Sequence, residues 1–544
     1  MADIRLSFLG FFTSPGIAEV YTRLSYNELQ FVMVIFFLFH IIVFFSEELF
    51  MKVRLAFTFL LIGIGVLYAK PSTRQTPNVI VILADDLGYA DLSSQRGSKD
   101  LKTPNIDKMI DAGVVCTNGY VTSPQCAPSR AGLMMGRYNQ RIGFDTIPDG
   151  PLPLEIITLA ERMKDAGYAT GHVGKWHLEP NAVCIDFAKK NYPESIKTHG
   201  KEKRAALTQA IINKYQSGAQ GFDDFFSGEM YRYWSNFDLE GKNLALETKY
   251  RNFKKEDFRI DIQTKAATCF IDRHHDKPFF LYLCYYAPHV PLEAPEKYLS
   301  RFPENMPERR KMALAMVAAM DDGVGQIRGK LYNYGILENT LIFFLADNGA
   351  PLGAQTAEGP MVDTPAKLSS GVWDGSRNEP LTGEKGMLME GGIRVPFVVS
   401  WPAKLPKGKV YSDPVISLDI AASSVAATGR QVPAELEGID LIPAINGANK
   451  TTRSLYWRFW NQAAIRQGKY KYFYLGDGRH YLVDLDEDIS ERHNLISKYP
   501  EIATRMKKDL EQWTEKLEPK GLPTVPPNGQ EMNWYKYYLE GQSQ

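Results

Sequence analysis

Cysteine is scarce in this sequence, which has five cysteines among 544 residues and no C-x-x-C pair. So few cysteines cannot form a disulfide framework or a cysteine-based zinc site. An excess of charge is also lacking, because 63 Lys and Arg residues balance 63 Asp and Glu residues. Nucleic-acid-binding chains usually carry a basic excess, so we expect no nucleic-acid partner.

The composition is typical of a globular protein. Apolar residues make up 44% of the chain and charged residues 23%. Both values are near the averages for folded proteins, so most of the chain should bury a core rather than stay disordered. At roughly 150 residues per domain, the length fits three or four domains, or one large α/β unit with an appendage.

Two apolar stretches lie near the start of the chain, at residues 31–45 and 55–67, and only the second has interpretable flanks. Lys52 and Arg54 form a basic segment before it, and Tyr68-Ala69 provides a small-residue cleavage site after it. The 13 residues of this stretch fall short of the roughly 20 that a membrane-spanning helix needs.

We therefore expect residues 51–69 to be a secretory signal peptide that begins at Met51. Residues 1–50 would then be an upstream segment from a start assigned too early. The alternative is a membrane hairpin formed by both apolar stretches. Export predicts a periplasmic or secreted protein, with its cysteines in an oxidising compartment.

Further along the chain, four short apolar runs end in polar residues. Short runs that alternate with amphipathic stretches, such as residues 155–166 and 311–334, indicate an α/β protein with a largely parallel sheet. Ligands bind outside the carboxyl ends of strands in such sheets, so the polar residues should share one pocket. The runs are residues 79–84, 168–173, 279–286 and 341–346, followed by Asp85-Asp86, Lys175-Trp176-His177, His289 and Asp347-Asn348 respectively.

The acidic residues of these segments suggest a metal site. Asp85, Asp86 and Asp347 would repel one another at close range unless a cation held them. With Asn348 they offer only hard oxygen ligands, which suit calcium or magnesium better than zinc. Taken singly, each of these residues would more often cap a helix or stabilise a turn.

A second group of residues is cationic or able to carry protons. Around a divalent ion, Arg and Lys side chains would form a pocket for a small tetrahedral dianion, and His side chains could move protons. A single histidine is usually a core or surface residue, but two of these directly follow strand ends. The group comprises Arg130, Lys175, His177, His289 and Lys385.

The segment Cys126-Ala127-Pro128-Ser129-Arg130 precedes helix-compatible residues 131–135. A cysteine at a helix N-terminus can have a lowered pKa and act as a thiolate nucleophile, and the alternative is a buried thiol. The pattern C-x-P-S-R resembles the maturation signature of type I sulfatases, in the alkaline phosphatase superfamily. In that family the cysteine is oxidised to formylglycine.

The resemblance covers about residues 78–495, and the order of its segments is more specific than any one of them. One departure is Glu179, where the family usually has glycine, which affects the loop and its substrate contacts more than the chemistry. The matching segments are DDLGY from Asp85, TPNID from Thr103, GKWHL from Gly174, APH from Ala287, DNG from Asp347, PLTGEKG from Pro380, EGGIRVP from Glu390, and YLVDL from Tyr481 with Glu491 and Asn494-Leu495.

The resemblance implies a calcium ion and a role for each candidate residue. One hydroxyl of a formylglycine hydrate would attack sulfur and expel the alcohol, and the second would collapse to the aldehyde and expel sulfate, which serine could not do. A formylglycine-generating enzyme is therefore an implied partner. The implied calcium ligands are Asp85, Asp86, Asp347, Asn348 and the modified Cys126. Arg130 would hold the hydrate and the metal site, and Lys175 and Lys385 would bind the sulfate. His289, as the acid for the leaving oxygen, and His177, as the partner of the second hydroxyl, would also contact the sulfate.

The expected fold is α/β: a large mixed, mostly parallel sheet sandwiched by helices, as in alkaline phosphatase, over residues 75–450. Residues 451–544 should form a smaller C-terminal antiparallel sheet packed with a helix. Its strands are predicted at residues 454–459, 463–474 and 481–484, and its helix at residues 499–517.

The substrate is less clearly indicated. Trp373 lies in a Gly- and Ser-rich stretch and could stack on a sugar or pack under its own loop. Secretion and the many Tyr and Trp residues favour a sulfated saccharide, such as a carrageenan-like algal galactan or a glycosaminoglycan. Two alternatives stay open: a phosphodiesterase or phosphonate hydrolase on the same scaffold, and a non-catalytic polyanion-binding protein in which Cys126 is not converted.

Overall fold

The computed structural model describes residues 76–93, 99–199, 202–245, 250–354, 356, 360–363, 372–448 and 452–540. Thr76–Gln544 form one structural unit, and the description below concerns that unit alone. The expected signal peptide at residues 51–69 and the upstream segment at residues 1–50 lie outside the described residues. Among the residues described, no helix has the length and apolar character needed to cross a membrane.

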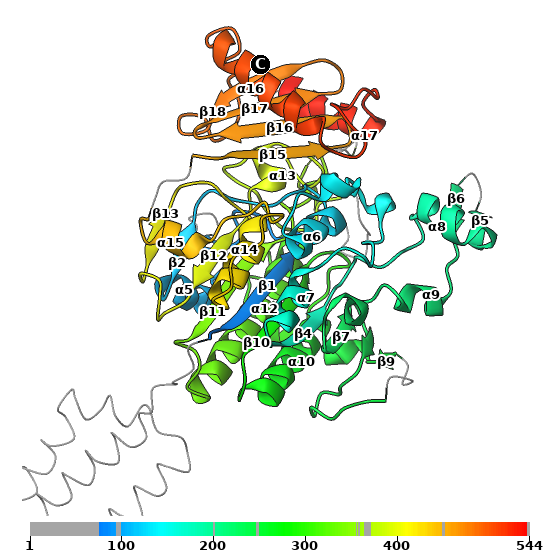
Figure 1. The fold of residues 1–544 in the computed structure, drawn as a ribbon, viewed down its shortest axis with the longest axis vertical. Helices are drawn as coiled ribbons and strands as arrows, with labels where there is room; N and C mark the ends of the chain where they lie inside the picture. Colours follow the sequence, from blue (N-terminus) through cyan, green and yellow to red (C-terminus); the bar gives the residue numbers. More distant parts are fainter. Residues whose placement is uncertain are drawn as a thin grey trace, which may run out of the picture. The chain divides into compact units, whose positions relative to one another are not determined.

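A ten-stranded sheet lies at the centre of the unit (Figure 1). The strands from β11 to β7 pair in parallel, and antiparallel pairing adds β12 and β2 on one side and β8 and β9 on the other. The sheet is therefore mixed, with a parallel centre, as expected. In spatial order its strands are β13 (Lys409–Tyr411), β2 (Val114–Cys116), β12 (Phe397–Ser400), β11 (Thr340–Ala346), β1 (Asn78–Asp85), β10 (Phe279–Pro288), β4 (Ala169–Gly174), β7 (Asp224–Gly228), β8 (Arg232–Ser235) and β9 (Arg251–Asn252).

The burial of the central strand β1 explains why it is a continuous apolar run in the sequence. All eight residues of β1 are buried, and five of them, from Val79 to Leu83, are large and apolar. A parallel strand covered on both faces needs such a continuous run, whereas a strand with one wet face alternates. Burying each large side chain contributes about 1.5–3 kcal/mol, which favours the central position of this strand.

Helices cover the sheet in two groups (Figure 1). In the first, α10 and α12 pack on each other and on β10; in the second, α6, α7 and α14 contact one another. The helices are α5 (Pro104–Asp111), α6 (Cys126–Met135), α7 (Leu159–Asp165), α8 (Ile185–Asn191), α9 (Gln209–Asn213), α10 (Arg259–His274), α11 (Glu296–Leu299), α12 (Glu308–Asn333), α13 (Glu390–Ile393), α14 (Leu418–Ala427) and α15 (Leu441–Ile445). Two small sheets pair β3 (Gly119–Tyr120) with β14 (Val415–Ile416) and β5 (Ile196–His199) with β6 (Glu202–Ala205).

A smaller antiparallel sheet follows, coloured orange in Figure 1, and it matches the expected C-terminal part. Helix α16 packs on β15, β16 and β17. A further helix, α17, continues into a short π-helical turn at Lys536–Glu540. The elements are β15 (Ser454–Phe459), β16 (Gln462–Gln467), β17 (Tyr470–Leu475), β18 (His480–Asp484), α16 (Pro500–Thr514) and α17 (Gly529–Tyr535).

Two of the expected boundaries are wrong, each for a local reason. The helix expected over residues 155–166 begins only at Leu159, because Thr158 caps it: the Glu161 amide donates to the Thr158 hydroxyl over 3.2 Å, and the Thr158 amide donates to the Glu161 carboxylate over 2.7 Å. The single strand expected over residues 463–474 is two strands, since Gly468 adopts φ 58° and turns the chain between β16 and β17.

A buried group of charges joins the C-terminal sheet to the segment that carries α13. The Lys471 ammonium of β17 donates to Glu390 over 2.9 Å and to Glu491 over 2.8 Å, and all three side chains are fully buried. The Tyr120 hydroxyl donates to the second oxygen of Glu390 over 2.6 Å. Lys471 thus bridges two buried carboxylates between the two parts of the structure, and Arg394 also pairs with Glu390, at 3.3 Å.

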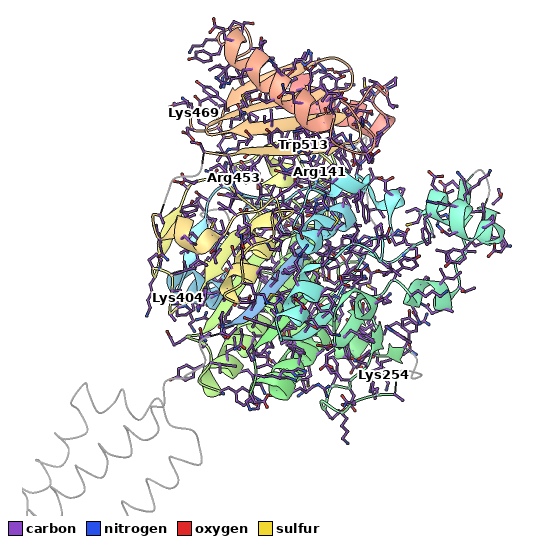
Figure 2. The ribbon with its side chains drawn as sticks, viewed as in Figure 1. Arg141, Lys254, Lys404, Arg453, Lys469 and Trp513 are labelled. Carbon is purple, nitrogen blue, oxygen red and sulfur yellow. The ribbon has the colours of Figure 1, made fainter. Side chains whose placement is uncertain are left out.

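Replacing Lys471 with methionine should destabilise the protein by about 3–5 kcal/mol, because Glu491 loses its paired cation and Glu390 keeps only Arg394. Urea unfolding followed by circular dichroism measures the loss. The matched control is Lys469→Met, two residues earlier, labelled in Figure 2, where a partly exposed ammonium pairs with Asp484. Equal stabilities of the two variants would contradict the structural role of Lys471.

Candidate active site

The four strands with polar ends are neighbours in the sheet, in the order β11, β1, β10 and β4, and all run in parallel. Their carboxyl ends therefore meet at one edge, as expected. Asp85 ends β1, and Asp86 follows it in a left-handed conformation with φ 63°. The other polar residues follow directly: Asp347 and Asn348 after β11, Lys175 after β4 and His289 after β10.

Helix α6 brings Cys126 and Arg130 to the same edge. Cys126 is the first residue of the helix, and all ten residues of the helix are buried. One turn later, Arg130 donates from Nε and from one terminal nitrogen to Asp347 Oδ2, over 3.0 and 2.7 Å. Its other terminal nitrogen donates to the carbonyl of Lys175 over 2.8 Å. Arg130 therefore ties the ends of β11 and β4 to the helix.

Two lysines complete this network of charges. Lys175 Nζ donates to Asp85 Oδ2 over 2.7 Å. Lys385 Nζ contacts both oxygens of Asp86, at 2.7 and 2.8 Å, and Asn348 Nδ2 donates to Asp86 Oδ1 over 2.6 Å. Three carboxylates, counting Asp347, thus face three cations, counting Arg130, in a region where water is largely excluded.

Four potential metal ligands come together here. One ligand atom each of Asp85, Asp86, Cys126 and His289 lies within 4.8 Å of the others. Within the part of the chain that the structure describes, the buried Oδ1 atoms of Asp85 and Asn348 accept no hydrogen bond. Buried oxygens without donors are what a hard cation would satisfy, so these residues fit a site for calcium or magnesium.

This cluster differs in part from the expected ligand set. His289, which we expected to act as an acid, joins it, and Asp347 is outside it. Arg130 already occupies Asp347 Oδ2, and the amide of Asp86 donates to Asp347 Oδ1 over 3.2 Å.

Burial and charge set the protonation of the acids. Burial opposes the ionisation of Asp85, but Lys175, His289 and Arg130 outweigh it and hold the pKa of Asp85 well below its usual range. Burial and the nearby Asp85 raise the pKa of Asp347 to about 7. The negative charge of the site is therefore concentrated at the end of β1.

Comparison with known proteins identifies the family. The sulfatase family profile matches residues 77–430, more than half of the chain. The chain belongs to the sulfatase family. As a member of this family, within the alkaline phosphatase superfamily, it is a sulfuric ester hydrolase. A second profile, of the C-terminal part of N-sulphoglucosamine sulphohydrolase, matches residues 383–516.

Relatives with curated names are sulfatases too. N-acetylgalactosamine-6-sulfatase of Canis lupus familiaris is 30% identical over 416 residues, covering 73% of this chain and 71% of the relative. N-acetylgalactosamine-6-O-sulfatase of Bacteroides thetaiotaomicron is 28% identical over 494 residues, covering 80% and 93%.

Solved structures share the fold. Ps i-CgsB, which has also been solved in complex with k-i-k-neocarrahexaose, superposes with TM-score 0.65 at 28% identity, over 85% of this chain and 98% of that one. The phosphonate monoester hydrolase SpPMH from Silicibacter pomeroyi superposes with TM-score 0.57 at 15% identity, over 81% and 96%. The latter likeness concerns the fold alone.

The surroundings of Cys126 in this sulfatase oppose the thiolate form. Burial raises its pKa to about 11, and the nearby Lys175 and Lys385 only partly offset that effect. For the unmodified side chain, burial therefore favours the alternative of a buried thiol over a nucleophilic thiolate. All five cysteines of the chain are buried and free.

The two histidines of the sulfatase site are neutral at pH 7. Burial lowers the pKa of His289 to about 4. Its Nδ1 lies 2.6 Å from the carbonyl of Val290, which only accepts, so Nδ1 carries the proton and Nε2, 3.6 Å from Asp86 Oδ2, is free to accept one or to bind a cation. Burial and Lys175 lower the pKa of His177 well below its usual value, and its buried Nδ1 has no partner among the described residues.

Sequence reasoning missed two buried acids. Glu384 accepts hydrogen bonds from the amides of Leu352, Gly353 (2.7 Å) and Ala354 (2.9 Å), which hold the turn before Lys385. Asp374 is buried, and burial together with the charge of Asp86 raises its pKa well above the usual range. Both lie in segments where only the folded structure reveals burial.

The interpretation of Trp373 as a sugar platform is wrong, and the packed alternative is confirmed. The side chain is 3% exposed, its Nε1 donates to the carbonyl of Ser376 over 2.7 Å, and Arg309 donates to its carbonyl. Glu179, the departure from the family pattern, has its pKa raised to about 7 by burial, so it is partly protonated at neutral pH.

Gly174 places Lys175, because it adopts φ 98° and the amide of Lys175 then donates to the carbonyl of Cys284 over 3.1 Å. A Cβ at Gly174 would lie 1.9 Å from that carbonyl oxygen. Gly174→Ala should therefore lower the free energy of unfolding by more than the control Gly167→Ala, measured in urea. Gly167 has φ 85°, and a Cβ there would meet no described atom within 4 Å, so its substitution costs only about 1–2 kcal/mol of left-handed strain.

Equal costs for the two substitutions would show that the turn after β4 tolerates a side chain, and that Gly174 does not fix the position of Lys175.

Proposed function

We propose that this sulfatase removes an O-sulfate group from a saccharide, using formylglycine formed from Cys126 and a bound calcium ion. The observation that carries the proposal is the cluster of Asp85, Asp86, Cys126 and His289 within 4.8 Å, with Lys175 and Lys385 bonded to its two carboxylates. Hard oxygen ligands, a modifiable side chain and two ammonium groups are the parts that sulfate ester hydrolysis requires.

Calcium would be held by Asp85, Asp86, Asp347, Asn348 and residue 126. When bound, such an ion stabilises negative charge on sulfuryl oxygens. The buried Oδ1 atoms of Asp85 and Asn348, which accept no hydrogen bond from the described residues, support this assignment. Even when fully ionised, the three carboxylates only balance the three cations, so a divalent ion would make the site positive overall and favour an anionic substrate.

The remaining residues act on the sulfate group and on protons. Lys175 and Lys385, whose pKa values the neighbouring Asp85 and Asp86 raise despite burial, stay charged and bind sulfuryl oxygens. Arg130 positions residue 126 through the helix and holds Asp347. His289 Nε2 takes part in proton transfer at the leaving oxygen once an anionic substrate has raised its pKa, and His177 assists at residue 126.

Formylglycine at residue 126 would offer, when hydrated, two hydroxyls on one carbon, so that one can attack sulfur and the other can release the product. The high pKa of Cys126 supports conversion over direct attack, because an unmodified buried thiol is a poor nucleophile. A formylglycine-generating enzyme is the partner that this proposal needs.

The saccharide substrate is inferred from relatives. Two are named N-acetylgalactosamine-6-sulfatases, and Ps i-CgsB was solved with a neocarrahexaose. We infer a glycosaminoglycan or a carrageenan-like galactan as the substrate class here. We also propose that a signal peptide at residues 51–69 directs the protein to the periplasm or out of the cell. The catalytic domain would comprise residues 75–450, and the C-terminal subdomain residues 451–544.

Cys126→Ser should bind sulfate esters but fail to turn over, because a serine ester cannot release sulfate by collapse to an aldehyde. Steady-state hydrolysis of 4-nitrophenyl sulfate should fall at least about a thousandfold. Mass spectrometry of the peptide across residue 126, in protein made with a formylglycine-generating enzyme, should show aldehyde in the wild type. Full turnover by the serine variant would refute the mechanism.

The same assay separates the alternatives. A phosphodiesterase or phosphonate hydrolase would prefer phosphorus esters of 4-nitrophenol over the sulfate ester. A polyanion-binding protein would hydrolyse none of them and keep Cys126 unmodified even when the maturation enzyme is present.

Calcium should raise the melting temperature, because an ion that binds only the folded state stabilises it, by about 2.7 kcal/mol at a concentration 100 times its Kd. We expect EDTA to reverse the rise and magnesium to reproduce it poorly. Asp86→Asn should abolish the effect, whereas Asp186→Asn, an exposed acid on α8, should keep it. A melting temperature insensitive to both ions would count against the metal site.

A further inference from the structure

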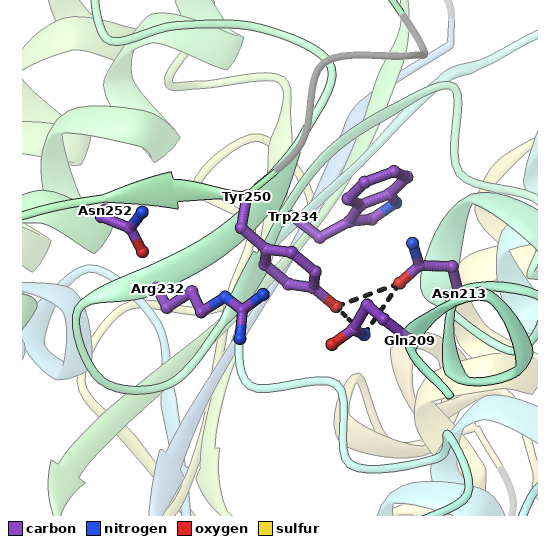
Figure 3. A pocket seen from close by; sticks show the side chains of 6 residues that line it. All are labelled: Gln209, Asn213, Arg232, Trp234, Tyr250 and Asn252. Atoms are coloured by element: carbon purple, nitrogen blue, oxygen red, sulfur yellow. Dashed lines mark hydrogen bonds between the residues drawn. The ribbon is translucent and has the colours of Figure 1, made fainter. Parts of the chain in front are cut away.

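A pocket of about 430 Å³ lies outside the catalytic cluster, along the β8–β9 side of the large sheet (Figure 3). It is lined by Gln209, Asn213, Arg232, Trp234, Tyr250 and Asn252. The described residues of this lining provide two aromatic rings, three amides and one cation, and none of them is a carboxylate. No step of the proposed hydrolysis uses these residues.

Strand geometry explains how the pocket forms. Tyr233 and Ser235 of β8 are buried, so the alternate residues Arg232 and Trp234 share the other face of the strand. Asn252 of β9 pairs with Arg232 across the ladder. Helix α9 contributes Gln209 and Asn213, which are four residues apart and therefore lie on one side of the helix.

Contacts within the pocket hold Tyr250 in its middle. Its ring lies 4.0 Å from the Arg232 guanidinium carbon, and its centroid is 5.4 Å from that of Trp234. Its hydroxyl donates to Asn213 Oδ1 over 3.0 Å, and Gln209 Nε2 donates to the same oxygen over 3.1 Å (Figure 3). Among the described residues, Asn213 Nδ2 and Gln209 Oε1 keep free hydrogen-bonding capacity.

The pocket lies close to the catalytic edge. Gly174, which directly precedes Lys175, pairs with Ser227 on β7, and Ser227 pairs with Trp234 on β8. Two strand spacings therefore separate the backbone of Trp234 from that of Gly174, or about 10 Å. Burial raises the pKa of Tyr250 to about 12, and the charge of Glu179, two residues after His177, adds to that effect.

We propose that this pocket binds a second, anionic sugar of the saccharide whose sulfated sugar enters the catalytic cluster. The inference rests on the proposed function. The Trp234 ring offers an apolar face to a sugar ring, the amides of Asn213 and Gln209 bind hydroxyls, and Arg232 binds the anion.

Guanidinium forms paired hydrogen bonds with planar or tetrahedral oxyanions, so the anion is either a sulfate ester or a uronate carboxylate. Arg232 is the one charged side chain among the described lining residues, which favours an anionic sugar over an amino sugar. Because the pocket contacts only the second sugar, its residues should affect saccharide binding and not the chemistry at sulfur.

The test compares a sulfated hexasaccharide with 4-nitrophenyl sulfate, which is too small to span both sites. For Trp234→Ala and Arg232→Met, the ratio of kcat/KM for the hexasaccharide to kcat/KM for 4-nitrophenyl sulfate should fall about tenfold, through KM. Trp234→Phe should restore most of the ratio, because it keeps an aromatic face. Matched controls are Tyr332→Ala, an exposed aromatic of α12, and Arg204→Met, an exposed cation of β6, which should leave the ratio unchanged.

Two hexasaccharides identify the anion. If the pocket binds a uronate, Arg232→Met should weaken the binding of a chondroitin 6-sulfate hexasaccharide alone. If the pocket binds a sulfate ester, the same substitution should weaken the binding of a carrageenan hexasaccharide as well. An unchanged ratio for both hexasaccharides, in an enzyme that hydrolyses them and 4-nitrophenyl sulfate, would overturn the pocket assignment and leave the proposed function intact.

A binding measurement keeps the inference testable if the enzyme hydrolyses none of these esters, an outcome that would count against the proposed function instead. Calorimetric titration of the Cys126→Ser protein with each hexasaccharide should then show weaker binding when Trp234→Ala is added. Equal affinity with and without that substitution, for both hexasaccharides, would overturn the inference.

Discussion

The site depends on the compensation of three buried carboxylates by three cations, of which Arg130 and Lys175 are buried and Lys385 is partly exposed, at one edge of the sheet. Asp85, Asp86 and Asp347 are each at most 1% exposed, so none can rely on water for solvation. Ionised groups in such surroundings persist only when they are paired and hydrogen-bonded. Arg130, Lys175 and Lys385 provide that pairing, and each comes from a different part of the chain. Folding of distant segments and assembly of the site are therefore one event.

The parallel sheet makes this arrangement possible. Adjacent strands β11, β1, β10 and β4 end at the same edge of the sheet, so the residues that follow them meet without long loops. Left-handed conformations at Asp86 and Gly174 turn the chain sharply at two of these ends. The side chains thereby point into one space, while the backbone carbonyls of Lys175 and Cys284 accept hydrogen bonds that fix the turns.

The sequence predicts much of this because its signals are local. The apolar run of β1 and the acids after it can be recognised without a partner strand, and so can Cys126 before a helix. Features set by long-range packing could not be predicted in the same way. The pKa of Cys126 depends on burial by other segments, and the packing of Trp373 depends on Arg309 of α12. The pocket around Tyr250 joins α9, β8 and β9, which no motif connects.

The C-terminal sheet is part of the catalytic unit, because it holds the segment that carries Lys385. The Gln462 side chain of β16 donates to the carbonyl of Gly386 over 3.1 Å and accepts from the amide of Leu388 over 2.9 Å. A Cβ at Gly386 would lie 2.4 Å from the ring of Trp534 in α17, so that ring packs directly on the turn. The two family profiles overlap over residues 383–430, where these contacts converge. The division that we propose near residue 450 would therefore separate two parts of the chain but not two functions, since the pairing of Lys385 with Asp86 depends on contacts from both parts.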